Sequence, residues 1–224
     1  MTTSASQIID VEALGWFTVT AGVQARPLWV AADNSRRVLF IRFSPGAALD
    51  RHVHDGDEVQ YVLEGSVGDD YGTIEAGNVG YRPSGCTHTV HSSTGATTVA
   101  FITGGVKPVA DGEVGGPASV VIDVGAVPEQ ELRPGIFARE VWSDPDRDRR
   151  ALVVRYEPGA TIARHRHVGD EFVYVLRGSL GDESGVITTG NAGFRHDGCE
   201  HTVSTTTGAT VFAVVRGGVE RAEV

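Results

Sequence analysis

The amino-acid sequence predicts an all-β protein built from two tandem antiparallel barrels. The first observation is an internal repeat: residues 8–106 align with residues 121–219 without a gap, and 48 of the 99 aligned positions are identical. A unit of this length is too long for a solenoid repeat and fits one small domain. The second observation is that short apolar runs alternate with turn signals, with no long apolar stripe of helical period. Each repeat is therefore expected to form one barrel.

The expected strands of the first repeat are four short runs rich in β-branched and aromatic residues. They cover residues 37–43, 58–63, 87–90 and 97–102. Pro-Gly, Asp-Gly and Ser-Gly pairs, which favour tight turns, punctuate the sequence between them. Many short strands with this punctuation are typical of an antiparallel sandwich or barrel.

Domain organisation follows from the repeat. The segment 107–119 lies between the two copies and has the Gly and Pro content of a linker. We expect an N-terminal domain over residues 1–113 and a C-terminal domain over residues 114–224.

Composition and charge exclude several classes of function. The chain is 41% hydrophobic and 21% charged, which is typical of a globular protein, and its net charge is -10. This charge argues against a nucleic acid or an anionic membrane as the partner. No signal peptide or membrane span is apparent, so we expect a cytoplasmic protein that acts on a small molecule. Cys86 and Cys199 occupy equivalent repeat positions, and a disulfide between them is not expected.

Each repeat carries the same four potential metal ligands, 113 residues apart. Histidines at i and i+2 of a strand share one face, so the first two can chelate together. A turn then returns the chain to the glutamate, and barrel closure brings the third histidine across. Three imidazoles and a carboxylate suit Fe, Mn, Ni, Co or Zn better than Ca or Mg. The two predicted ligand sets are His52, His54, Glu58 and His88, and His165, His167, Glu171 and His201.

Two further pairs of residues have alternative interpretations. Cys86 and Cys199 each precede a ligand histidine by two positions, and so either face the site or act as small buried hydrophobic residues, which is the favoured role. Arg82 and Arg195 either orient an anionic substrate or pair with acidic neighbours such as Asp69.

Two longer motifs surround the ligands of the first repeat, Gly46-x5-His52-x-His54-x3-Glu58-x6-Gly65 and Gly77-x5-Pro83-x-Gly85-x2-His88. These motifs resemble those of the cupin family, so the whole chain resembles a bicupin with two double-stranded β-helix (jelly-roll) barrels. The second repeat departs at His196, where the family has proline. Finer features, such as Arg82-x-Ser84-Gly85, resemble the ChrR-like cupins, named after the sensor domain of an anti-sigma factor.

The resemblance implies two divalent transition metal ions, one per barrel, with iron favoured over zinc, manganese or nickel. It also implies a non-haem dioxygenase that cleaves a small diketone or hydroxyketone, with Glu58 or Glu171 as a base. A redox-neutral isomerase or cyclase is the first alternative, and a non-catalytic metal-dependent sensor is the second. Sigma-factor inhibition is disfavoured because fewer than ten residues precede the first repeat.

The two sites are expected to differ in their substrate pockets. Gln60 is matched by Val173, and Tyr81 is matched by Phe194. The first pocket is therefore the more polar one, and we expect it to be the main catalytic centre. Because the duplication already pairs two barrels in one chain, a monomer or a homodimer of bicupins is expected.

Overall fold

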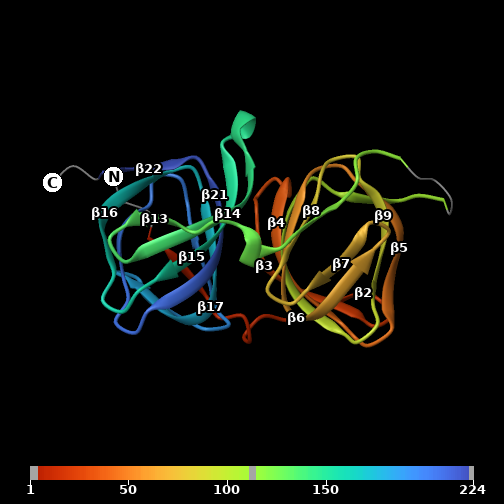
Figure 1. Cartoon of the computed structure of the whole chain (residues 1–224), viewed down its shortest axis with the longest axis horizontal. Coiled ribbons are helices and arrows are strands. Elements are labelled where there is room, and N and C mark those ends of the chain that lie inside the picture. Colours follow the sequence, from red (N-terminus) through yellow and green to blue (C-terminus); the bar gives the residue numbers. More distant parts are fainter. Residues whose placement is uncertain (1–4, 111–114, 222–224) are drawn as a thin grey trace. The chain divides into compact units, whose positions relative to one another are not determined.

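The computed structural model describes residues 5–110 and 115–221. The chain divides into two compact units, Leu14–Ala126 (the first barrel) and Met1–Ala13 with Val127–Val224 (the second barrel). Each unit is a curled antiparallel β-sheet, which confirms the predicted all-β class and duplicated barrel fold (Figure 1). The boundary expected between residues 113 and 114 lies outside the described residues.

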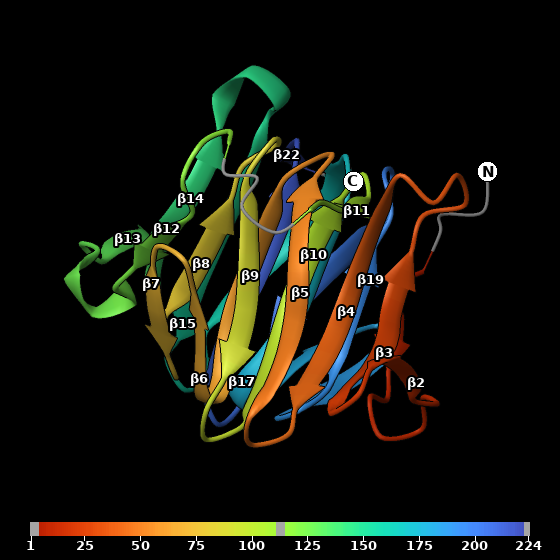
Figure 2. The same ribbon diagram turned by 90° about the vertical axis from the view of Figure 1, so that its right-hand side faces the viewer.

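The first barrel is one sheet of eleven strands in the order β11-β5-β9-β6-β10-β4-β3-β2, with β7 and β8 paired to β6 and β12 paired to β8 (Figure 2). A 3-10 turn, η1 (Val124–Ala126), follows the last strand. The strands are β2 (Phe17–Thr20), β3 (Val23–Val30), β4 (Arg36–Phe43), β5 (Ala47–His54), β6 (Glu58–Asp69), β7 (Gly72–Glu75), β8 (Val79–Arg82), β9 (Thr87–Ser92), β10 (Ala96–Thr103), β11 (Val106–Pro108) and β12 (Val120–Ile122).

The second barrel repeats this order as β13-β14-β15-β21-β17-β20-β16-β22, with β18 and β19 paired to β17 and β1 paired to β19. A 3-10 turn, η2 (Pro145–Arg147), joins its second and third strands. The strands are β1 (Gln7–Ile9), β13 (Gln130–Arg133), β14 (Ile136–Asp144), β15 (Arg149–Tyr156), β16 (Thr161–Val168), β17 (Glu171–Asp182), β18 (Gly185–Thr188), β19 (Ala192–Arg195), β20 (Glu200–Ser204), β21 (Ala209–Arg216) and β22 (Gly218–Arg221).

The repeats exchange their first strands. Strand β1 belongs to the first sequence repeat but pairs with β19 of the second barrel, and β12 of the second repeat pairs with β8 of the first barrel. The exchanged segments are fixed at equivalent points, because the backbone N–H of Val11 donates to Asn191 Oδ1 and that of Val124 donates to Asn78 Oδ1, both at 3.1 Å. Each compact unit is thus completed by residues from the other repeat.

One long strand forms the corner of each barrel. The first half of β6 pairs with β10 and β8, and its second half pairs with β7 and β9. Gly65 lies between the halves at φ 69°, where an added Cβ would collide with the carbonyl of Gly95. Glycine is therefore required at this bend, and Gly178 occupies the same position in β17 at φ 77°.

Each barrel has its own apolar core of small and branched side chains. In the first barrel this core includes Val23, Val62, Ala100 and Ile102, and in the second it includes Ile136, Val175, Val211 and Ala213. Burial of these side chains fixes the register of the strands, because a slip of one residue would turn the apolar face outward. The register in turn fixes which polar side chains point into the barrel.

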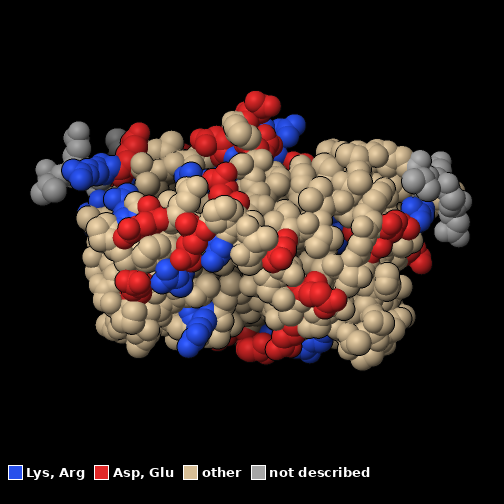
Figure 3. Space-filling model, viewed as in Figure 1, with Lys and Arg blue, Asp and Glu red and all other residues tan. Residues whose placement is uncertain are grey.

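The molecular surface is mixed in charge. On the face shown in Figure 3, acidic and basic side chains form small groups among uncharged residues. None of the helices in the described residues is long or apolar enough to span a membrane.

Candidate metal centres

Three histidines converge inside the first barrel. His52 and His54 lie near the end of β5, and His88 lies on the adjacent strand β9, directly opposite His52 in the antiparallel register. One ring nitrogen from each residue lies within 4.8 Å of the others, and the Nε2 atoms of His54 and His88 are 2.9 Å apart. The structure therefore brings together the three histidines that the sequence grouped.

The second barrel repeats this arrangement on β16 and β20. His165 lies opposite His201 in the register, and His167 follows two positions along the strand. The Nε2 atoms of His167 and His201 are again 2.9 Å apart, and all three residues form one cluster within the same 4.8 Å limit. The centroid distances between the rings match those of the first barrel, so the two clusters have the same geometry.

Hydrogen bonds at Nδ1 orient several of the rings. His52 Nδ1 lies 2.8 Å from the carbonyl oxygen of Asp50, and His165 Nδ1 lies 3.1 Å from that of Ala163. A proton on Nδ1 satisfies these contacts and leaves the Nε2 lone pair directed into the cluster. His201 Nδ1 likewise lies 3.1 Å from Asp182 Oδ2. Such outer contacts fix the tautomer of histidines that bind metals.

The exchanged segments complete this outer layer. In the first barrel His88 Nδ1 lies 3.4 Å from Asp69 Oδ2, and the hydroxyl of Ser119 donates to the same oxygen at 2.8 Å. In the second barrel the hydroxyl of the equivalent serine, Ser6, lies 3.7 Å from Cys199 Sγ, and Ser6 also helps to lower the pKa of the Asp182 carboxyl. Neither serine was predicted from the sequence as part of a site. The two serines are 113 residues apart, so the repeat marks them as equivalent positions. Only the strand exchange shows that each serine lies near the metal centre of the other repeat.

Burial keeps His54 and His167 neutral. Together with the smaller effect of the neighbouring histidines, and against the opposing charge of Glu58 or Glu171, it lowers the pKa of His54 and that of His167 to about 4. Burial also lowers the pKa of His52 and of His165. Neutral imidazole is the form that binds a metal ion, so the sites are ready for a cation at neutral pH.

The donor set fits a transition metal ion. Two Nε2 atoms at 2.9 Å require a shared proton when no cation lies between them, whereas three inward lone pairs are satisfied together by one ion. Imidazole nitrogen suits Fe, Mn, Co, Ni, Cu and Zn. The residues that would hold the ions are His52, His54 and His88 in the first barrel and His165, His167 and His201 in the second.

The two glutamates start the strands that follow the paired histidines, as predicted, but they lie outside the three-residue clusters. Glu58 Oε1 accepts a hydrogen bond from Arg82 Nη1 at 2.9 Å. Burial opposes ionisation of Glu58, but Arg82 and then His54 lower its pKa below the ordinary value. Glu171 differs, because its Oε2 lies 4.0 Å from His167 Nε2 and 3.8 Å from Arg195 Nη1. Glu171 is therefore less tightly held than Glu58.

Arg82 is fully buried in a polar network of the first barrel. Its Nη1 donates to Glu58 and, at 2.9 Å, to Gln60 Oε1, while its Nη2 lies 3.3 Å from Asp69 Oδ2. The Gln60 amide in turn donates to Thr98 Oγ1 at 3.0 Å. Gln60, which the sequence suggested as a pocket residue, is thus engaged inside the protein.

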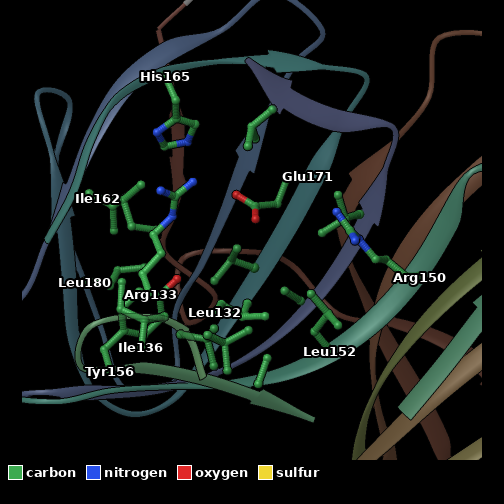
Figure 4. A pocket seen from close by; sticks show the side chains of 18 of the residues that line it. Leu132, Arg133, Ile136, Arg150, Leu152, Tyr156, Ile162, His165, Glu171 and Leu180 are labelled. Carbon is green, nitrogen blue, oxygen red and sulfur yellow. The ribbon is translucent and has the colours of Figure 1, made fainter. Parts of the chain in front are cut away.

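A cavity of about 330 Å³ opens onto the second metal centre (Figure 4). Figure 4 shows His165 and Glu171 directed into it from opposite strands of the barrel. The walls are mostly apolar. Lining residues include His165, His167, Glu171 and Arg195 from the site, Ile136, Leu152, Val154, Ile162, Leu180, Val203, Val211 and Val215 from the core, and Arg133 and Arg150.

The remaining predicted pocket residues lie outside this lining. Cys86 and Cys199 are completely buried, and burial raises the pKa of Cys86 to about 11. Phe194 packs edge-on against His196, and Tyr81 donates to Asp57 Oδ1 at 3.1 Å. Each of these aromatic residues immediately precedes a buried arginine, so strand alternation directs its side chain to the opposite face.

The fold and the paired histidine clusters define a bicupin with one candidate metal centre in each barrel. The model of the ChrR cupin-like domain matches residues 4–107 and again residues 117–219. The chain therefore belongs to the ChrR cupin-like family and contains two copies of its domain. None of the curated proteins matches the chain.

Solved structures share the fold at low sequence identity. A candidate dioxygenase from Nostoc punctiforme PCC 73102 superposes with a TM-score of 0.85 at 13% identity, covering 98% of this chain and 87% of that one. Oxalate decarboxylase from Bacillus subtilis superposes with a TM-score of 0.68 at 14% identity, covering 99% and 79%. At these identities the likeness establishes the bicupin fold and does not determine the reaction.

Proposed function

We propose that the chain is a metal-dependent dioxygenase acting on a small diketone- or hydroxyketone-like molecule, with the second barrel as its catalytic centre. The observation that carries this proposal is the cavity of about 330 Å³, which presents His165, His167 and Glu171 to a space large enough for a small organic ligand. The fold of the Nostoc candidate dioxygenase is consistent with this class.

The choice of barrel reverses the preference drawn from the sequence. That preference rested on the polarity of Gln60, but Gln60 is buried and hydrogen-bonded to Arg82 and Thr98. Val173 at the equivalent position is part of the wall of the cavity. We therefore assign substrate turnover to the second barrel and a supporting, metal-binding role to the first.

The residues around the cavity have distinct roles in this proposal. His165, His167 and His201 hold the metal ion, which supplies Lewis acidity and, when it is iron, the redox chemistry that dioxygen requires. Glu171, whose Oε2 lies 4.0 Å from His167 Nε2, takes the proton from the carbon next to the substrate carbonyl. The apolar walls exclude water from the carbanion-like product of that step.

The test compares matched variants of the two glutamates. We would load the full-length protein with iron and measure oxygen uptake with a series of 1,3-diketones and hydroxyketones. Glu171→Gln should lower the turnover by at least about a hundredfold, the usual contribution of a positioned base. Glu58→Gln, the same change in the other barrel, should retain most of the activity.

Three results would overturn parts of this assignment. Tightly held zinc with no oxygen uptake on any such substrate, but turnover without dioxygen, would favour the redox-neutral isomerase or cyclase. Loss of activity in Glu58→Gln alone would return the catalytic centre to the first barrel. Metal binding with no turnover in either assay would leave a sensor role.

A further inference from the structure

Arg195 has an unsatisfied donor beside the second metal centre. Its side chain is only 1% exposed and lines the cavity. Its Nη2 donates to Asp182 at 3.4 Å, but its Nη1 has no hydrogen-bond partner among the described residues. Glu171 Oε2, the nearby carboxylate oxygen, is 3.8 Å from Nη1, which is too far for a hydrogen bond.

The first barrel shows what normally satisfies this group. There the equivalent Nη1 of Arg82 donates to Glu58 and Gln60. In the second barrel Val173 replaces Gln60 and Val211 replaces Thr98, so both the amide and the hydroxyl that support it are missing. Two substitutions have therefore removed the internal acceptor and kept the buried cation.

An unpartnered charged donor is costly inside a protein. Leaving a buried charged group without its hydrogen bond costs the full desolvation penalty of that group, so an oxygen that enters the cavity and accepts this bond offsets that penalty. The low polarity of the surroundings strengthens such a bond. An anionic oxygen would gain most, because charge-assisted hydrogen bonds are about twice as strong as neutral ones.

A second arginine adds positive charge to the same cavity. Arg133 lines the cavity with His165 and also lines the adjoining groove over β16 and β22, and Figure 4 shows its side chain directed toward His165. The first barrel has Thr20 at this position. Because the side chain of Arg133 is exposed, it can meet an anion that enters from solvent.

The remaining walls of the cavity determine the size and polarity of the rest of the ligand. The cavity holds about 330 Å³ and is lined mainly by aliphatic side chains such as Ile136, Leu152 and Leu180. A volume of this size accommodates a ligand of several carbon atoms, and its walls favour an apolar body.

We propose that the second barrel binds a small organic anion with an apolar body, and that Arg195 Nη1 holds the anionic oxygen beside the metal centre. This inference rests on the proposed function, for which it names the charge and shape of the substrate. A carboxylate and the enolate of a diketone share the required oxygen chemistry.

Binding to the zinc-loaded full-length protein tests the proposal without turnover. Isothermal calorimetry would compare hexanoate, hexane-2,4-dione and hexanamide, which are similar in size. Hexanoate should bind once per chain and at least tenfold more tightly than hexanamide. If the dione binds with proton release and hexanoate does not bind, the anion is an enolate; if only hexanoate binds, it is a carboxylate. Measurable binding of hexanoate and hexanamide with equal affinity, or binding of neither hexanoate nor the dione enolate, would overturn the proposal.

The two barrels supply a matched pair of variants. Val173→Gln with Val211→Thr imports the internal acceptors of the first barrel and should weaken anion binding at least tenfold. Gln60→Val with Thr98→Val makes the reverse change and should not weaken it. Arg195→Lys retains one charged nitrogen for Asp182 but removes the second terminal nitrogen, Nη1, and should also weaken anion binding. This variant keeps the proposal testable if the double variant misfolds.

Failure of this inference is distinguishable from failure of the proposed function. Unchanged anion affinity in both Val173→Gln/Val211→Thr and Arg195→Lys would refute the role of Arg195 even if oxygen uptake were observed. Tight anion binding that depends on Arg195 without oxygen uptake would refute the dioxygenase and preserve the anion site.

Discussion

Metal removal followed by a shift from pH 7 to pH 5 should destabilise each barrel by about 2 kcal/mol. The perturbed groups are His54 and His167, which are both 2% exposed and whose pKa is lowered by burial to about 4. In the unfolded chain an unperturbed histidine has a pKa of about 6.5. Between these values the unfolded chain binds more protons than the folded one, so stability falls as the pH falls from about 6.5 toward 4.

The magnitude follows from the two pKa values. At pH 5 the unfolded histidine is almost fully protonated and the folded one mostly neutral, which gives about 2 kcal/mol for one residue in each barrel relative to pH 7. Urea unfolding of the metal-free protein at several pH values measures this loss of stability. With a dependence of about 1–3 kcal/mol per molar urea, the midpoint should fall by roughly 1 M.

A matched pair of variants isolates the cause. His54→Gln with His167→Gln removes the two most strongly shifted groups and should reduce the pH dependence between pH 5 and pH 7, while the lowered pKa values of His52 and His165 leave a smaller part of it. His91→Gln, at an exposed position on β9, should leave it unchanged. An equal fall in midpoint for the double variant and the unchanged protein would show that the buried histidines are not responsible.

Three further predictions concern the serines near the metal centres, the buried cysteines and the glycine at the barrel corner. Ser119→Ala should lower the metal affinity of the first site by about tenfold, and Ser6→Ala should lower that of the second site equally, because outer contacts of metal-binding histidines contribute about 10–100-fold to metal affinity. Titration of each variant with Co²⁺, followed by the absorption of the bound ion, checks this. Ser93→Ala, at an exposed position, is the control. Cys86 and Cys199 should react with a thiol reagent only after unfolding, since both are completely buried and burial raises the pKa of each; rapid labelling of the folded protein would contradict this. Gly65→Ala should destabilise the first barrel by at least about 1 kcal/mol in urea unfolding, because the positive φ and the Gly95 carbonyl leave no space for a Cβ; an unchanged midpoint would refute that account of the barrel corner.

The sequence was sufficient to predict the barrels and the histidine clusters. A period of two along a strand brings His52 and His54 to one face, and the repeat showed that the same geometry was needed twice. Strand order, by contrast, depends on long-range pairing that local patterns do not contain. For that reason the exchange of β1 and β12 was not predicted, and neither was the contact of Ser119 with Asp69.

Side-chain partners also underlie the different roles that we propose for the two barrels. By its residue type, Gln60 indicates a polar substrate pocket. In the structure, however, its amide oxygen accepts a hydrogen bond from Arg82. By its residue type Val173 is the less informative of the two, yet its lack of a polar group leaves Arg195 Nη1 without an acceptor in the described part of the chain. A residue's chemical type thus does not show whether its polar group serves a ligand or the protein itself.

Metal stoichiometry is the most direct test of the central claim that each barrel holds one transition metal ion on three histidines. Elemental analysis of the purified protein after reconstitution should give two ions per chain, falling to one in His88→Ala and one in His201→Ala. A content of zero, or two ions retained in both variants, would contradict the assignment of these clusters as metal centres.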